Sequence, residues 1–245
     1  MLRVTAMTHR GAVREHNEDA LVVGPFTACG VDMADPITWE LPVLSPVLVA
    51  VADGMGGHAA GELASAHTVR ALAAATPPDQ DGAHAALRSI DRELLAMALA
   101  DAAIAGLGTT VAGVVLGPGG GFCFWVGDSR VYLEHGGYLA QISEDDRGPG
   151  GGLTQSLGGR TGNGELRATV APLTAAGRLL LCSDGLSDLV SVETMEGLLN
   201  GPGGSVRAVK SLWAAAMNAS GRDNITIALV EPCGPAHHAA EEAGR

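Results

Sequence analysis

The apolar residues of this chain are grouped in two kinds of segment. Short apolar runs bounded by turn residues predict strands at 20–23, 47–52, 110–116, 122–126, 131–133, 138–142, 179–182 and 224–230, with a further strand near Thr169. Longer segments rich in helix-forming residues predict helices over 59–75, 84–105, 193–199 and 206–219. Gly136-Gly137, between two of the predicted strands, indicates a hairpin turn.

The order of these elements indicates one α+β domain with sheets at the centre and helices outside. A length of 245 residues fits one large domain or two small ones. We find no linker and no internal repeat. We therefore expect a single domain over 1–233, followed by a polar C-terminal tail over 234–245.

Composition narrows the function classes. The chain is 47% apolar but only 3% aromatic, which predicts an aliphatic core. With 27 acidic and 15 basic residues its net charge is −12, which argues against general nucleic-acid binding. No run approaches the ~20 apolar residues of a membrane span, and the N-terminus lacks a signal-peptide core. The four cysteines form no C-x-x-C pair, which favours the reducing compartment of the cytoplasm. From charge, apolar runs and cysteines together we expect a cytoplasmic protein without membrane or nucleic-acid partners.

Acidic residues recur at the ends of predicted strands. Asp53-Gly54 and Asp184-Gly185 each follow an apolar strand, where a glycine allows the backbone to turn sharply. The other acids in similar positions are Glu18, Asp19, Asp128 and Asp223. Each one alone has an ordinary explanation, such as a turn or, for Asp128, a local ion pair with Arg130. At Gly185 we expect the glycine only to make the turn.

Taken together, the strand-end acids predict a metal site. Several carboxylates on one sheet system would repel one another unless a cation lay among them. Ligands that are all oxygen select hard cations such as Mg²⁺ or Mn²⁺, and no zinc-type Cys–His spacing is present. Arg14 and His58 are the nearby groups without negative charge, although a lone Arg or His is more often a surface residue.

These residues resemble the metal-dependent protein phosphatase family, also called protein phosphatase 2C. The resemblance extends from Thr8 to about Val230, and its motifs follow in the family's order. They are Arg14–Asp19 (R-x-x-N-E-D), Asp53–His58 (D-G-M-G-G-H), Gly108–Thr110, Val126–Arg130, Leu153–Gly158, Ser183–Leu186 and Arg222–Thr226.

The resemblance implies a central antiparallel β-sandwich flanked by helix pairs. It also implies a bacterial-type phosphoserine/phosphothreonine protein phosphatase, in which water activated by two Mg²⁺ or Mn²⁺ ions attacks phosphorus without a phosphoenzyme. The metal ligands that it implies are Glu18, Asp19, Asp53, the Gly54 carbonyl, Asp184 and Asp223, with Asp128 and Asp184 at a weaker third site. Arg14 is then expected to hold the phosphate, and His58 to protonate the leaving group.

One segment departs from the family pattern. The mobile flap that members usually carry is reduced to 147–152, and Asp146 stands where histidine is common. This leaves substrate recognition and affinity for a third ion open. The partners implied are a phosphorylated protein and a Ser/Thr kinase or its target.

Other functions compete with this interpretation. The first is a non-catalytic module that binds phosphoproteins on the same scaffold. The second is a phosphatase of small phosphate esters. The third, a nucleotide binder, is weakest, because Gly54–Gly57 lacks the G-x-G-x-x-G spacing and no P-loop lysine follows.

Overall fold

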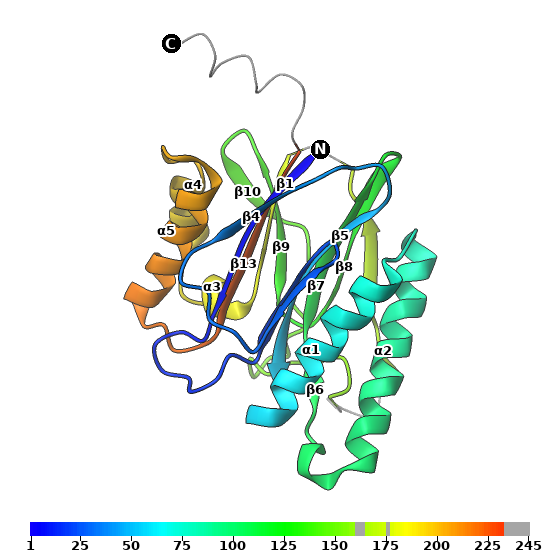
Figure 1. The fold of residues 1–245 in the computed structure, drawn as a ribbon. Helices are drawn as coiled ribbons and strands as arrows, with labels where there is room; N and C mark the ends of the chain where they lie inside the picture. Colours follow the sequence, from blue (N-terminus) through cyan, green and yellow to red (C-terminus); the bar gives the residue numbers. More distant parts are fainter. Residues whose placement is uncertain (160–164, 175–176, 233–245) are drawn as a thin grey trace.

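The computed structural model of this chain describes residues 1–159, 165–174 and 177–232 (Figure 1). The side chains at positions 58 and 59 also lie outside the description. The strands are β1 (Leu2–His9), β2 (Asp19–Val23), β3 (Phe26–Cys29), β4 (Ile37–Leu41), β5 (Val47–Met55), β6 (Gly108–Thr109), β7 (Val111–Gly117), β8 (Gly120–Val126), β9 (Arg130–His135), β10 (Tyr138–Gln141), β11 (Thr169–Pro172), β12 (Arg178–Cys182) and β13 (Ile225–Pro232). The helices are α1 (His58–Ala75), α2 (Gln80–Ala100), α3 (Asp184–Ser187), α4 (Val192–Leu199) and α5 (Gly204–Ala219), with a 3₁₀ turn at Ala102–Ile104.

Two antiparallel sheets pack face to face. One has the strand order β10-β9-β12-β13-β1-β4 and the other β11-β8-β7-β5-β2-β3, while β6 pairs with the end of β5. Val4, Val49 and Leu181 are fully buried between the sheets, within an almost entirely aliphatic layer. The predicted central antiparallel sandwich is confirmed.

A helix layer covers the outer face of each sheet (Figure 1). Helices α1 and α2 bury an apolar layer against the sheet that contains β5, with Leu48, Leu87 and Phe124 at its centre. Helices α4 and α5 do the same on the other side, where Leu180 and Leu212 are fully buried. The flanking helix pairs follow from the sequence, because each sheet has two apolar faces and needs a cover for the outer one.

Several boundaries differ from the prediction. Strands β1, β3, β4 and β6 and the short helix α3 were not predicted, since none of them contains a continuous apolar run that stands out from the neighbouring loops. Strand β1 owes its place to pairing with β13 and β4. The helix predicted over 84–105 was placed too late, because Asp79 caps the start of α2 by accepting a hydrogen bond from the Gly82 N–H.

The strand ends that carry the acidic residues meet at one edge of the sandwich. Asp19 at the start of β2 is directly opposite Asp53 near the end of β5. On the facing sheet, the end of β12 pairs with the start of β13, so the loops after Cys182 and before Ile225 are adjacent. The two sheets therefore bring together residues that are more than 150 positions apart in sequence.

The remaining fold predictions have mixed outcomes. Gly136 and Gly137 both have positive φ, as a two-residue hairpin turn requires. Among the described residues, Cys29, Cys123 and Cys182 are free thiols, and no helix is long and apolar enough to cross a membrane. The predicted boundary at 233 and the tail over 234–245 lie outside the described residues.

Replacing Leu181 tests the contribution of the layer between the sheets. Leu181→Ala is expected to lower the free energy of unfolding by about 2–5 kcal/mol, because the fully buried side chain leaves a cavity. Leu44→Ala, at an 87% exposed position, should change it by no more than about 0.5 kcal/mol. Urea denaturation measures both; equal effects of the two variants would contradict this account of the core.

Candidate metal centre

A cavity of about 460 Å³ opens at the edge where the strand ends meet. Its walls are strongly acidic. The lining residues are Arg14, Glu18, Asp53, Gly54, Met55, Gly56, Gly57, Thr110, Asp128, Arg147, Gly151, Leu153, Asp184, Asp188, Asp223 and Asn224. Of the eight selected residues whose side chains the structure describes, all but Asp19 are in this lining.

Asp19 lies beneath the cavity rather than in its wall. Its side chain is completely buried, and its Oδ2 accepts hydrogen bonds from the hydroxyls of Ser183 (2.8 Å) and Thr226 (2.7 Å) on the facing sheet. Its other oxygen, Oδ1, is buried without a hydrogen-bond partner. Such an orphaned carboxylate oxygen carries a large desolvation cost unless a cation or water contacts it.

Backbone contacts fix the position of Asp53. Its carbonyl accepts hydrogen bonds from the Thr109 hydroxyl (2.8 Å) and the Thr110 N–H (2.9 Å), and its N–H donates to the Thr110 hydroxyl. The Thr110 hydroxyl also bonds to Ser129, next to Asp128. This explains why the Gly108–Thr110 motif accompanies the acidic motifs: it anchors the strand end that carries Asp53.

The two Asp-Gly pairs have different geometries. Strand β5 continues through Gly54, and the sharp turn comes at Gly56 and Gly57, which have positive φ. A Cβ on Gly54 would lie 2.2 Å from the Gly61 carbonyl oxygen, so close packing with α1 requires this glycine. The expectation that Gly185 only makes a turn is wrong: it lies in α3, and a Cβ there would meet the Asn224 carbonyl oxygen at 1.8 Å.

Asn224 holds the loop that carries Arg14 and Glu18. Its side-chain amide donates to the carbonyls of Arg10 (3.0 Å) and His16 (2.9 Å), and its Oδ1 accepts from the Glu18 N–H (2.8 Å). The Glu18 carbonyl in turn accepts hydrogen bonds from the Gly54 N–H and the Ser65 hydroxyl. These contacts place Glu18 beside β5 and set the loop at the rim of the cavity.

Burial and mutual repulsion perturb the acids of this edge. Desolvation raises the pKa of Asp53 well above its usual value, and the charges of Asp19, Asp184 and Asp223 raise it further. Desolvation likewise raises the pKa of Asp19 to about 7 and that of Asp184 to about 6, with neighbouring aspartates adding to both. The fold therefore concentrates negative charge where water cannot screen it well.

Two arginines partly neutralise the cavity. The Arg14 Nη2 lies 2.8 Å from the Asp223 Oδ2, at a half-exposed rim position. Arg147 contacts Asp128, Asp184 and Asp188. The suggested local pair of Asp128 with Arg130 is wrong, because Arg130 binds Asp145 through two of its nitrogens.

The carboxylates in and beneath the cavity wall fit a pair of divalent cations, although they do not surround a coordination site as they stand. Within the described part of the chain, no three His, Cys, Asp or Glu side chains converge closely enough to hold an ion as they stand. Like-charged carboxylates spread apart, and the arginines draw Asp184 and Asp223 toward themselves. The orphaned Asp19 Oδ1 beside Asp53, in an all-oxygen donor set, nevertheless matches hard cations.

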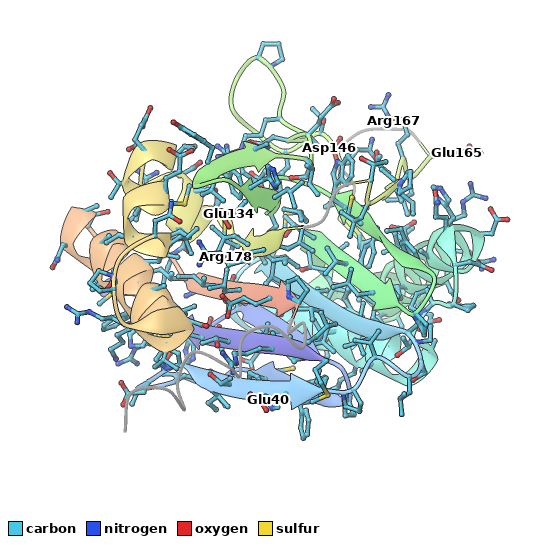
Figure 2. The ribbon with its side chains drawn as sticks, turned by 90° about the horizontal axis from the view of Figure 1, so that it is seen from above. Glu40, Glu134, Asp146, Glu165, Arg167 and Arg178 are labelled. Atoms are coloured by element: carbon cyan, nitrogen blue, oxygen red, sulfur yellow. The ribbon has the colours of Figure 1, made fainter. Side chains whose placement is uncertain are left out.

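Sequence reasoning missed two groups in the cavity wall. Asp188 lies four residues after Asp184, and the turn of α3 between them, a helix that was not predicted, brings both into the wall. Arg147 was noted only as part of the shortened flap. Asp146 does not line the cavity: its carboxylate accepts a hydrogen bond from the Gly127 N–H (2.9 Å), and it lies on the same side of the molecule as Arg167 (Figure 2). The side chain of His58, at the start of α1, is outside the described residues.

Comparison with known proteins identifies the family. The family model described as "Protein phosphatase 2C" matches residues 33–230. The chain belongs to the protein phosphatase 2C family. Its strands β1, β2 and β3 precede the matched region, yet they belong to the two sheets, and β2 contributes Asp19.

Individual relatives agree with this placement. The serine/threonine protein phosphatase PstP of Mycobacterium tuberculosis is 32% identical over 94% of this chain, which spans 45% of that relative. The serine/threonine phosphatase stp of Listeria monocytogenes is 28% identical over 91% of the chain and 93% of its own length. The crystal structure of the PstP catalytic domain in complex with two manganese ions has a TM-score of 0.73 and 31% identity, covering 94% of this chain and 99% of that one.

Asp53→Asn tests the electrostatic cost of the acidic edge. A raised pKa means that the folded state holds the proton more tightly than the unfolded state, so the metal-free protein loses stability as the pH rises from about 4. At pH 7.5 the metal-free variant should therefore melt at a higher temperature than the wild type, by roughly 2–4 °C for each 1 kcal/mol relieved. The difference should vanish near pH 4.

Thermal denaturation with and without Mn²⁺ completes this test. Mn²⁺ should raise the Tm of the wild type and have little effect on Asp53→Asn, since a ligand that binds only the folded state stabilises it. Asp35→Asn, at an exposed acid remote from the cavity, should behave as the wild type. A metal-free variant that is less stable than the wild type at pH 7.5 would refute the electrostatic account.

Proposed function

We propose that this chain is a metal-dependent phosphoserine/phosphothreonine protein phosphatase that uses two divalent ions, Mg²⁺ or Mn²⁺. The observation that carries the proposal is the convergence of Asp53, Asp184, Asp223 and Arg14 on one cavity. Membership of the family and the two manganese ions of the PstP structure support it. Because the chain spans less than half of PstP, the main support for the activity is the cavity itself and not that relative.

Each acid has a distinct part in holding the ions. Asp53, the Gly54 carbonyl, Asp184 and Asp223 would hold the ions, and Glu18 and Asp19 would act directly or through water. When bound, such an ion pair lowers the pKa of water and so supplies the nucleophile at neutral pH. Among the described residues of the lining there is no serine or cysteine, as expected where water is the nucleophile.

Arg14 is placed to hold the phosphate. It lies at the rim, half-exposed, and among the described contacts only Nη2 binds Asp223. Because Nη2 carries two N–H groups, one planar fork remains, formed either by Nε and Nη2 or by Nη1 and Nη2. A guanidinium matches two phosphate oxygens at once and stabilises the charge that develops on them. Asp223 and Asn224 keep this group in position, because Asn224 fastens the loop to the start of β13.

His58 is proposed as the acid that protonates the departing seryl or threonyl oxygen. The support is its motif position and its place at the start of α1, one residue after Gly57, which lines the cavity. The turn over 147–152 is short and exposed, so it does not enclose the cavity. This suits an extended phosphorylated segment of a protein better than a small molecule. A protein phosphorylated by a Ser/Thr kinase is the partner that this chemistry requires.

A phosphothreonine peptide assay tests the proposal. Purified protein should release phosphate with Mn²⁺ and stop when EDTA is added, and Asp184→Asn should lower turnover on the order of 10²–10³-fold. Asp79→Asn, which alters only the cap of α2, serves as the matched control and should retain activity. Phosphopeptide binding by calorimetry without phosphate release would instead identify a non-catalytic module, and hydrolysis limited to small aryl phosphates a different substrate class.

Arg14→Lys separates charge from geometry at the rim. Lysine keeps the positive charge but loses the fork, so kcat/KM should fall roughly 10–100-fold, which corresponds to one charged hydrogen bond. Steady-state kinetics on the phosphopeptide measures this change. The Mn²⁺-induced rise in Tm should be unaffected, and a variant with wild-type kcat/KM would exclude Arg14 from phosphate binding.

A further inference from the structure

In the wall of the cavity, one guanidinium bridges three carboxylates. The Arg147 Nε lies 2.6 Å from the Asp128 Oδ2, and Nη2 lies 3.1 Å from the Asp184 Oδ2 and 3.0 Å from the Asp188 Oδ2. Asp128 is the most buried of the three, with its side chain only 7% exposed. These acids include both residues that the family resemblance assigns to a weaker third ion.

The short turn over 147–152 holds Arg147 in this position. Asp146 and Gly127 are joined twice, by the Asp146 N–H to the Gly127 carbonyl and by the Gly127 N–H to the Asp146 carboxylate (both 2.9 Å). Arg147 forms an antiparallel bridge with Leu153, and the Gly148 N–H closes the turn by donating to the Gly152 carbonyl. Because Gly127 directly precedes Asp128, the same backbone link positions the arginine and its main partner.

A guanidinium and a divalent ion compete for the negative charge of these carboxylates. Arg147 is permanently charged and covalently attached, so it remains near the carboxylates at any metal concentration. A cation that coordinates Asp128 and Asp184 through the same oxygens would have to displace it, against repulsion between like charges. Arg147 contacts only Oδ2 of Asp184, which leaves that carboxylate a second oxygen for a core ion.

We propose that the Arg147 guanidinium takes the place of a third divalent cation, so that this chain binds two ions and not three. The proposal rests on the proposed function, since it assumes the core pair of ions. It also assigns a role to the shortened flap, because Arg147 at the start of this turn is the cation that contacts the three acids.

Counting bound ions tests the proposal without an activity assay. Equilibrium dialysis against increasing Mn²⁺, followed by elemental analysis, should reach about two ions per wild-type chain at saturation. Arg147→Gln, which removes the charge and keeps hydrogen-bonding atoms, should bind a third ion. Arg147→Lys keeps a cation at the site and should remain at two.

Arg178→Gln is the matched control. Arg178 is as buried as Arg147 (25% against 27% side-chain exposure) and pairs with Glu134 and Glu231. It lies at the start of β12, whereas the cavity is beyond the other end of that strand, and Figure 2 shows it beside Glu134 and away from Asp146. This variant should still bind two ions. It therefore distinguishes the general effect of losing an arginine–carboxylate ion pair from the specific effect of removing Arg147.

The outcomes distinguish this inference from the proposed function. Two ions in the wild type and three in Arg147→Gln support it. Three ions in the wild type overturn it and leave the phosphatase proposal intact, and this measurement does not depend on any variant folding. Two ions in a folded Arg147→Gln, checked by circular dichroism, also overturn it. Fewer than two ions in the wild type overturn both proposals.

Discussion

The pair formed by Asp19, which is buried, and Asp53, which lines the cavity, is the interaction on which the rest of this structure depends. The two carboxylates are directly opposite each other on adjacent strands, and desolvation raises the pKa of each. A fold gains no stability from such a pair by itself. Its cost is tolerated because aliphatic layers on both sides of each sheet supply the stability, and because the pair is suited to a cation.

The hydrogen bonds around this edge serve mainly to keep charges in place. Ser183 and Thr226 reach across from the other sheet to orient Asp19, and Thr110 fixes the backbone of Asp53. Asn224 ties down the loop that carries Arg14. Ser183, Thr226 and Asn224 lie in the same motifs as the acids, and Thr110 lies in a motif that accompanies them. A carboxylate can hold an ion only if its neighbours prevent it from moving away.

The two arginines divide the cavity into regions with different roles. Arg14 is at the rim and partly open, so it can exchange Asp223 for another anion. Arg147 is held by a closed turn and engages three acids at once, which leaves it few donors for anything else. The difference lies in how the backbone presents each side chain, since the charge and the donor groups are the same.

The residue pattern alone determined an α+β domain with central sheets and outer helices and the acidic composition of the site, and the resemblance to a known family implied the two-sheet sandwich. Apolar runs fix which segments are buried, and acids placed directly after such runs must lie at sheet edges, so these features are local. Tertiary structure alone decided that Asp128 pairs with Arg147 rather than Arg130, that Asp188 joins the wall, and that Gly185 serves close packing. Those outcomes depend on distances between segments far apart in the chain, which pairing register and loop closure set and no local pattern encodes.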